Sequence, residues 1–353
     1  MNQFYSLRVK SVQEQTQDAI AIAFELEGDN RERFRFRPGQ HLTLRYQDQG
    51  EELRRCYSIC SRQGEEELTI AVKRVPGGRF SNWVNDNLKA GDALEVMPPQ
   101  GLFFQHAEKQ GGESYLGFAA GSGITPLLSI VKAVLGERPD SRFTLVYGNR
   151  SWRQTMFAEV LADLKDRYPS RFQLICLFSR EQGESDILNG RLDAARIQSL
   201  FASQLLADRY DHCFACGPEE MMQAVEQVLP DQGIDRERIH TERFNSGAPR
   251  AISAEQRAAR SQGEVSLVLD GREFRVEVSA EDDSILDAAL RAGADLPYAC
   301  KGGVCATCKC RVLEGEVDMA LNYSLEEDEV ARGYVLSCQA RPRSGAVRIS
   351  FDD

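Results

Sequence analysis

Apolar and polar positions follow three different patterns along the chain. In residues 4–106, short stretches in which apolar and polar residues alternate, such as residues 6–9 and 40–44, are broken by turn signals such as Pro38-Gly39. Alternation with a period of two is typical of half-buried strands. Many short strands separated by turns predict a small antiparallel β-barrel.

From residue 115 the pattern changes to an apolar strand, a Gly-rich turn and a helix. It repeats in the segments YLGFAAGSGITPLLSIVKAVL, FTLVYGNR, FQLICLFSR and CFACGPEEMMQAVEQVL. Strands that alternate with helices predict a doubly wound parallel α/β sheet. Residues 245–262 have no periodic apolar positions, so we expect a linker there.

The last part of the chain opens with two alternating strands in VSLVLDGREFRVEV, joined by Asp270-Gly271, a strong hairpin signal. Ser284 and Asp287 then form a capping box for a helix that we expect to end at Gly293. We therefore predict a barrel domain at residues 1–107, an α/β domain at 113–244, a linker at 245–262 and a third domain at 263–353.

Composition narrows the class of protein. The 353 residues suffice for two or three domains, no apolar run approaches the length of a membrane span, and the N-terminus has no apolar signal-peptide core. Ten cysteines scattered through a chain of this size fit a reducing compartment, so we expect a cytoplasmic protein that does not bind membranes.

Charge is concentrated in the last domain. Residues 263–353 hold 18 acidic and 10 basic side chains, so −8 of the net charge of −11 lies there. This argues against nucleic acid as a partner and favours a face that docks a basic protein. An acidic surface that only aids solubility is the alternative.

Four cysteines carry the strongest chemical signal. Cys300, Cys305 and Cys308 follow C-x4-C-x2-C spacing, and Cys338 comes after 29 intervening residues. This spacing is typical of a plant-type 2Fe-2S cluster, in which one loop supplies three thiolates and a distant strand the fourth. A structural zinc site is the alternative, but such sites usually contain two C-x2-C pairs.

Two elements of the first domain predict a flavin site. Arg55, Tyr57 and Ser58 lie on a predicted strand, and VKRVPGGRFSN runs from a strand through a Gly-rich turn into a helix. An arginine, a hydroxyl group and helix N-terminal amides suit a pyrophosphate, and a tyrosine ring packs on an isoalloxazine.

Two turns of the α/β domain predict a dinucleotide cleft. Gly121, Gly123, Thr125 and Pro126 follow the first strand of the sheet, and Cys216-Gly217-Pro218 ends a later strand. Ligands of doubly wound sheets bind at such carboxyl ends.

The segments RCYS, GGRFSN, GSGITP, CGPEEMM and HTERF, in this order, resemble the ferredoxin-NADP reductase superfamily, and the four cysteines resemble plant-type ferredoxins. The resemblance covers nearly the whole chain apart from the linker. A reductase followed by a ferredoxin is the order found in single-chain oxygenase reductases. It implies a flavin-binding β-barrel, a nucleotide-binding α/β domain and a β-grasp ferredoxin domain.

Carried over by position, the resemblance implies three groups of site residues. The flavin, FAD with FMN as the alternative, would contact Arg55, Cys56, Tyr57, Ser58, Val72, Lys73, Gly78, Phe80, Ser81, Thr125 and Phe244. The pyridine nucleotide would contact Gly121, Gly123, Thr125, Pro126, Asn149, Arg150, Ser179, Arg180, Cys216, Gly217 and Pro218. The hydride path would run near Ser58, Thr125, Cys216 and Glu242, with no acid or base catalyst. As alternatives, Cys216 is a small buried apolar residue, and Glu242 and Phe244 belong to a core strand.

The two strand ends Asn149-Arg150 and Ser179-Arg180 bear on the choice of nucleotide. The strand TLVYGNR ends without the acidic residue that often holds the ribose hydroxyls of NAD. An arginine beside a hydroxyl, as in Ser179-Arg180, suits a 2′-phosphate. We therefore expect NADPH. Residues 189–191 contain no match to the tyrosine of plant-type reductases, which leaves NADH open.

The resemblance implies an oxidoreductase that passes electrons from NADPH to FAD, then to the 2Fe-2S cluster and on to an oxygenase. The first expected acceptor is the phenylacetyl-CoA epoxidase of aerobic phenylacetate catabolism, and 3-ketosteroid 9-alpha-hydroxylase and the hybrid cluster protein are alternatives. Two hypotheses come from other functional classes: a redox sensor, and an iron-binding module with a degenerate reductase half.

Overall fold

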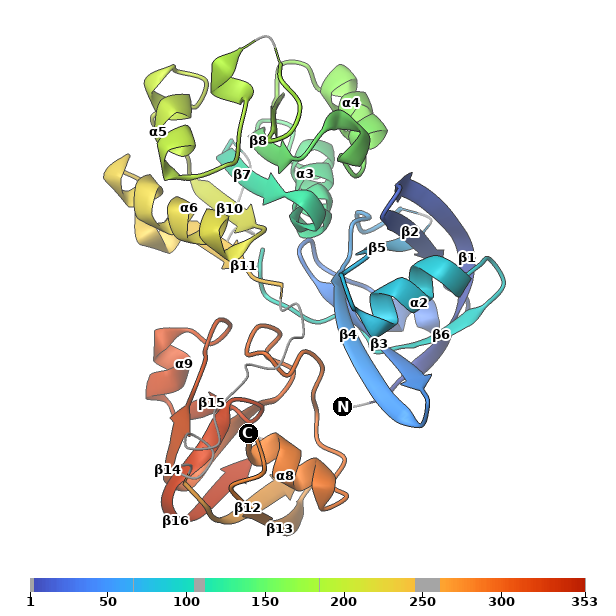
Figure 1. Cartoon of the computed structure of the whole chain (residues 1–353), viewed down its shortest axis with the longest axis vertical. Coiled ribbons are helices and arrows are strands. Elements are labelled where there is room, and N and C mark those ends of the chain that lie inside the picture. The colour runs from blue at the N-terminus through green and yellow to red at the C-terminus, as the bar shows by residue number, and fades with distance from the viewer. Residues whose placement is uncertain (1–2, 66, 105–111, 184, 245–260, 353) are drawn as a thin grey trace. The chain divides into compact units, whose positions relative to one another are not determined.

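The computed structural model describes residues 3–65, 67–104, 112–183, 185–244 and 261–352, which form two compact units (Figure 1). One unit is Phe4–Phe244, and the other is the C-terminal part of the chain. The linker predicted at residues 245–262 lies, except for its last two residues, outside the described residues.

The first unit begins with a six-stranded antiparallel barrel, in which the strand order is β4-β3-β6-β1-β2-β5. The strands are β1 (Tyr5–Thr16), β2 (Ala19–Phe24), β3 (His41–Asp48), β4 (Glu51–Ser58), β5 (Leu68–Lys73) and β6 (Ala93–Val96), with helices α1 (Asn30–Arg33) and α2 (Arg79–Asn87). A bridge between Ile59 and Ile70 joins the two edges of the sheet and closes the barrel. The predicted antiparallel barrel is confirmed.

The rest of this unit is a five-stranded parallel sheet, in which the strand order is β11-β10-β7-β8-β9. The elements are β7 (Ser114–Ala120), η2 (Gly121–Gly123), α3 (Ile124–Glu137), β8 (Arg142–Asn149), η3 (Trp152–Gln154), α4 (Ala158–Arg167), β9 (Phe172–Phe178), η4 (Asp186–Leu188), α5 (Ala194–Ala202), β10 (His212–Cys216), α6 (Glu219–Asp231), η5 (Arg236–Arg238) and β11 (Ile239–Glu242). Helices α3 and α4 share one apolar core with the sheet, while α5 and α6 share another. The order reverses between β7 and β10, and such a reversal is where doubly wound sheets bind ligands.

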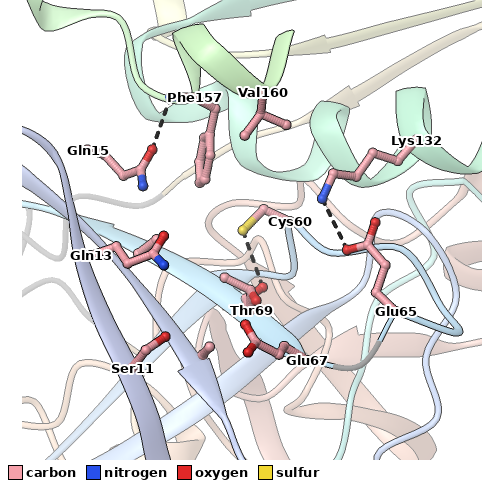
Figure 2. Close-up of a pocket in the computed structure, with 12 residues that line it drawn as sticks. Ser11, Gln13, Gln15, Cys60, Glu65, Glu67, Thr69, Lys132, Phe157 and Val160 are labelled. Atoms are coloured by element: carbon pink, nitrogen blue, oxygen red, sulfur yellow. Dashed lines mark hydrogen bonds and ion pairs between the residues drawn. The ribbon is translucent and has the colours of Figure 1, made fainter. Parts of the chain in front are cut away.

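The barrel and helices α3 and α4 are joined by a shared core and by polar contacts around a pocket of about 330 Å³ (Figure 2). Lys132 of α3 pairs with Glu65 at 3.1 Å, and the backbone N–H of Phe157 donates to Gln15 at 3.3 Å. The Ser129 hydroxyl donates to the Ser61 carbonyl at 2.7 Å. Because these contacts lie away from the strand ends, they hold the two domains together without occupying the cleft.

The C-terminal unit is a five-stranded mixed sheet with the strand order β13-β12-β16-β14-β15, packed against α8. Its elements are β12 (Gly263–Leu269), β13 (Arg272–Val278), α8 (Ile285–Arg291), β14 (Lys309–Met319), α9 (Glu327–Ala331), β15 (Tyr334–Leu336) and β16 (Ala340–Ser350). Only β12 and β16 pair in parallel. This arrangement agrees with the predicted β-grasp fold.

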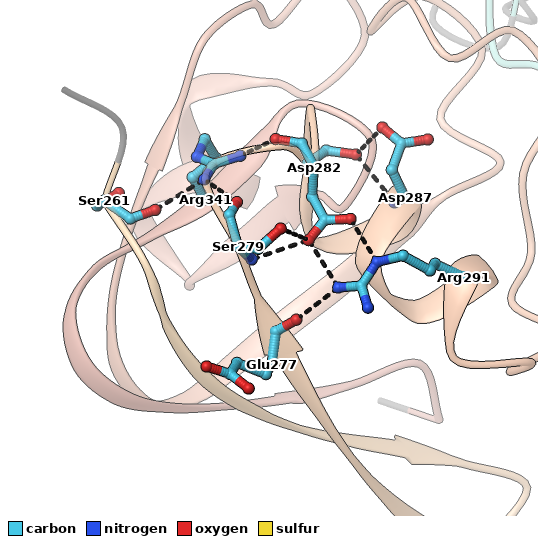
Figure 3. A network of polar contacts seen from close by, with 8 residues as sticks. Ser261, Glu277, Ser279, Asp282, Asp287, Arg291 and Arg341 are labelled. Atoms are coloured by element: carbon cyan, nitrogen blue, oxygen red, sulfur yellow. Dashed lines mark hydrogen bonds and ion pairs between the residues drawn. The ribbon is translucent and has the colours of Figure 1, made fainter. Parts of the chain in front are cut away.

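A polar network fixes the start of this unit (Figure 3). Arg341 of β16 donates to the carbonyl groups of Ser261, Ser279 and Asp282. The Asp282 carboxylate accepts two hydrogen bonds from Arg291, at 2.9 and 2.8 Å. Ser261 is the first described residue of this unit, so the network ties the start of the unit to strand β16, which follows Cys338.

Candidate functional site

The end of β4 presents a polar and aromatic surface. The Tyr57 ring stacks on the Phe80 ring of α2, with centroids 5.8 Å apart and an angle of 29° between their planes. Burial raises the pKa of the Tyr57 hydroxyl, so it stays protonated. Arg55 donates to the carbonyl group of its neighbour Arg54, and Cys56 lies 3.6 Å from the Thr43 hydroxyl.

The turn between β5 and α2 has the form of an anion cradle. Gly78 is the N-cap of α2, and no side chain caps that helix end. A Cβ at Gly78 would lie 2.5 Å from the Ser81 oxygen, which accepts a hydrogen bond from the Val75 amide. The first amides of a helix have no intrahelical partner, so this tight turn fits a flavin phosphate group. Of the other flavin residues, Lys73 pairs with Asp18 at 3.6 Å, and the Val72 side chain lies in the barrel core.

Strand β11 brings the barrel and the parallel sheet together at one carboxylate. The Ser58 hydroxyl donates to Glu242 Oε2 at 3.1 Å. Burial raises the pKa of Glu242 to about 7, although the charge of His41 and the Ser58 hydrogen bond act in the opposite direction. Cys216 is the register partner of Glu242, and burial together with the Glu242 charge raises the pKa of its thiol. A protonated Cys216 is not a nucleophile.

The two Gly-containing turns of the parallel sheet are in direct contact. A Cβ at Gly123 would lie 1.9 Å from the Cys216 carbonyl oxygen, and one at Gly217 would lie 2.7 Å from the side chain of Met221. Thr125 is buried and donates to the Ser122 carbonyl group at 3.0 Å. Only glycine allows these backbones to approach so closely.

A cleft of about 1190 Å³ opens above these turns. Its lining includes the predicted nucleotide residues Gly121, Asn149, Arg150, Ser179, Arg180, Gly217 and Pro218, together with Lys73 and Phe244 from the flavin set. Gly123, Thr125, Pro126 and Cys216 are buried beneath it. The structure thus brings most of the nucleotide set to one cleft, together with Lys73 and Phe244 of the flavin set.

The far end of the cleft is positively charged. Arg150 and Arg180 follow the neighbouring strands β8 and β9, and the Arg180 amide donates to the Arg150 carbonyl group at 2.8 Å. Within the described part of the chain, neither guanidinium group has an ion-pair partner. The buried side-chain nitrogen of Asn149 has no hydrogen-bond partner among the residues that the structure describes. Such donors fit a phosphate group.

Some lining residues were not predicted from the sequence. Arg74 and Arg191 line the cleft, and His41 interacts with Glu242. Arg74 directly follows the predicted Lys73, and Arg191 belongs to residues 189–191, which were compared above with the tyrosine position of plant-type reductases. The sequence therefore pointed to the neighbourhood of both residues. Nothing in the sequence pointed to His41, because only strand pairing brings it to Ser58.

The four predicted cluster ligands gather as two pairs of thiols. Interaction with Cys305 raises the pKa of Cys300, and interaction between Cys308 and Cys338 raises the pKa of Cys308 and lowers that of Cys338. The Gly302 amide donates to the Cys300 sulfur at 3.3 Å, and the Gly303 amide to that of Cys338. Amide donors aimed at sulfur suit thiolate ligands.

The loop that carries three of the cysteines turns sharply between them. Lys301, Gly303 and Ala306 all have φ between 51° and 76°, so the chain turns repeatedly between the ligands. Among residues with described positions, no three His, Cys, Asp or Glu side chains close around a single metal ion. Two separate thiol pairs match a 2Fe-2S cluster, in which each iron takes two cysteines. Cys310 is buried nearby on β14 and donates to the Val335 carbonyl group.

None of the helices in the described ranges is long and apolar enough to cross a membrane.

Comparison with protein families gives three successive matches. Residues 6–104 match the oxidoreductase FAD-binding domain, residues 118–227 the oxidoreductase NAD-binding domain, and residues 267–343 the 2Fe-2S iron-sulfur cluster binding domain. The order is the one predicted from the sequence.

Comparison with individual proteins extends the similarity to the whole chain. The chain is 52% identical to one of the subunits of the 1,2-phenylacetyl-CoA epoxidase of Escherichia coli, covering 100% of this chain and 99% of that one. It is 36% identical to the ferredoxin reductase component of 3-ketosteroid-9-alpha-monooxygenase of Rhodococcus rhodochrous, covering 98% and 96%. The solved structure of phthalate dioxygenase reductase has a TM-score of 0.60 and 24% identity, covers 99% of this chain and 98% of that one, and shows the fold.

Proposed function

This chain belongs to the family of oxygenase reductase components that join FAD-binding, NAD-binding and 2Fe-2S domains, and we propose that it delivers electrons from NADPH to the oxygenase of a phenylacetyl-CoA epoxidase. It is an oxidoreductase that uses FAD, a pyridine nucleotide and a 2Fe-2S cluster. The single observation that carries the choice of acceptor is the full-length similarity to the Escherichia coli epoxidase protein. The 3-ketosteroid oxygenase is the second candidate, supported by the lower similarity to its reductase.

We propose for the flavin residues the same roles that were expected from the sequence. The N-terminal end of α2, at Gly78 and Ser81, would hold a phosphate group, and the stacked rings of Tyr57 and Phe80 would form an aromatic surface beside the flavin. Bound FAD supplies the conversion of a two-electron hydride into single electrons. The buried residues Ser58 and Cys216 would lie beside the flavin together with Glu242, which accepts a hydrogen bond from Ser58.

NADPH is our proposed electron donor. Two guanidinium groups without ion-pair partners among the described residues, Arg150 and Arg180, lie at the end of the cleft away from Glu242's strand. A 2′-phosphate would supply the missing anion, whereas NADH would leave both cations uncompensated.

The cluster and its surroundings would form the exit for electrons. Cys300, Cys305, Cys308 and Cys338 are the proposed iron ligands, and amide donors stabilise their thiolate forms. The acidic composition of this domain supports a basic docking face on the oxygenase.

We also keep the predicted domain boundaries, at 1–107, 113–244 and 263–353, and a cytoplasmic location. None of the ten cysteines, all of which lie among the described residues, forms a disulfide, which supports a reducing compartment.

The experiment combines the purified chain with NADPH, phenylacetyl-CoA and the oxygenase component of a phenylacetyl-CoA epoxidase, and measures the epoxide. Product formation that requires this chain is expected. If no epoxide forms while the chain still reduces cytochrome c, the acceptor is wrong and the steroid oxygenase is tested next.

A further inference from the structure

A histidine faces the Ser58 and Glu242 pair from the neighbouring barrel strand. In the antiparallel pairing of β3 and β4, His41 stands directly opposite Ser58. Ser58 in turn donates to Glu242 of β11. Three side chains that are far apart in the sequence therefore meet at one point, where the barrel joins the parallel sheet.

His41 is held firmly in this position. Only 6% of the residue is exposed. Its backbone exchanges two hydrogen bonds with Gln100, at 2.8 and 3.0 Å. At Gly101, where φ is 116°, a Cβ would lie 3.1 Å from His41 Nδ1, so backbone covers the ring. The imidazole therefore has no room to swing away from Ser58 into solvent.

Few groups besides His41 face the Glu242 carboxylate. Ser58 approaches it from β4, and the protonated thiol of Cys216 lies beside it on β10. The adjacent Arg243 is turned away and binds Glu219 and Glu226. His41 is thus the group whose positive charge opposes the effect of burial on the pKa of Glu242.

We propose that His41 is a positioning residue of the reductase. His41 and Glu242, which both adjoin Ser58, share one exchangeable proton. The inference rests on the proposed function, because it takes Ser58 and Glu242 as residues of the flavin site. Reduction of the flavin by NADPH takes up one proton with each hydride, and two protons leave after both electrons have passed on. A pair that holds one proton keeps the buried site neutral between these steps, and its two groups titrate together.

The first test follows His41 directly, without relying on activity. The chain contains only four histidines, so carbon-13 labelled imidazole signals of the full holoprotein can be assigned by single His→Gln variants. Removing the negative charge with Glu242→Gln should lower the pKa of His41 by about one unit or more. His212→Gln is the matched control, because His212 pairs with Glu113 instead, and it should leave the His41 titration unchanged. Identical His41 titration in the parent and Glu242→Gln proteins would overturn the proposal.

The second test starts from His41 and does not depend on the folding of Glu242→Gln. In His41→Gln the pKa of Glu242 should rise by the same amount, since coupling between two sites is reciprocal. Infrared difference spectra of the carboxyl band and the pH profile of flavin reduction by NADPH should both shift upward by about one pH unit. An unshifted profile with intact turnover overturns only the role of His41, whereas absence of NADPH-dependent flavin reduction in the parent protein overturns the proposed function.

Discussion

Replacing Gly123 with alanine should push apart the two turns that form the floor of the nucleotide cleft. The added Cβ would lie 1.9 Å from the carbonyl oxygen of Cys216 and 2.4 Å from its carbonyl carbon. Both are backbone atoms at a strand end, so no side chain can move aside. Reaching the 3.0 Å that real Cβ contacts require demands a displacement of about 1.1 Å. Gly123 has φ of −61°, so the effect is steric and not due to backbone strain.

Such a displacement has two expected consequences. Overpacking of this kind costs about 1–3 kcal/mol of stability. A shift of 1 Å in a positioning group costs about 100-fold in rate, and Cys216 borders Glu242 and the expected hydride path. We therefore expect flavin reduction by NADPH to slow by about two orders of magnitude, with a lower melting temperature.

Stopped-flow bleaching of the flavin and thermal unfolding measure these effects. Gly183→Ala is the control, because among the described residues its Cβ would meet only the Asn189 side-chain oxygen, at 3.5 Å. That variant should behave like the parent protein. Parent-like rates and melting temperature in Gly123→Ala would show that the contact between the two turns is not as the structure has it.

Two further predictions concern the nucleotide and the C-terminal unit. Arg180→Gln should lower the ratio of kcat/KM for NADPH to that for NADH by about 10- to 100-fold, since one charge-assisted hydrogen bond is worth about 1.5–3 kcal/mol. The control Arg167→Gln, on α4, should leave this ratio unchanged. An unaltered ratio in Arg180→Gln would refute a 2′-phosphate site at Arg180. Arg291 holds the pKa of Asp282 at about 2, below its ordinary 3.8, so this carboxylate stabilises the fold above pH 4 and loses that effect as the pH falls towards 2. Denaturant unfolding followed by circular dichroism should show Asp282→Asn to be about 1–2 kcal/mol less stable than the parent protein at pH 6. This range allows for solvent screening of the ion pair, because the Arg291 side chain is exposed. The difference in unfolding free energy should narrow below pH 4, and a pH-independent difference would contradict this reasoning.

Features set by neighbours in the sequence could be predicted closely. Asp270 and Gly271 both have positive φ and join β12 to β13, as their hairpin signal indicated. Ser284 accepts a hydrogen bond from the Asp287 amide and begins α8. The helix ends at Arg291, two residues before Gly293, which follows in a left-handed conformation. Local backbone preferences decide such features, so the sequence contains them.

Contacts between distant segments could not be predicted in this way. The pairing of His41 with Ser58 depends on the register of two strands, and a shift of one residue would point His41 to the other face. The contact of Gly123 with Cys216 depends on which strands become neighbours in the parallel sheet. Motif resemblance named Ser58, Glu242 and Cys216 as one group, but the geometry that gives the group its chemistry exists only in the fold.

In the proposed function, electrons reach the acceptor only through the cluster, after the flavin. Cys305→Ser removes one proposed iron ligand, and Cys310→Ser changes a buried cysteine that is not one. With NADPH and the oxygenase acceptor, Cys305→Ser should still bleach its flavin but transfer no electrons onward, while Cys310→Ser should do both. Onward transfer at the parent rate by Cys305→Ser, or loss of flavin reduction in a folded Cys305→Ser protein, would contradict the account.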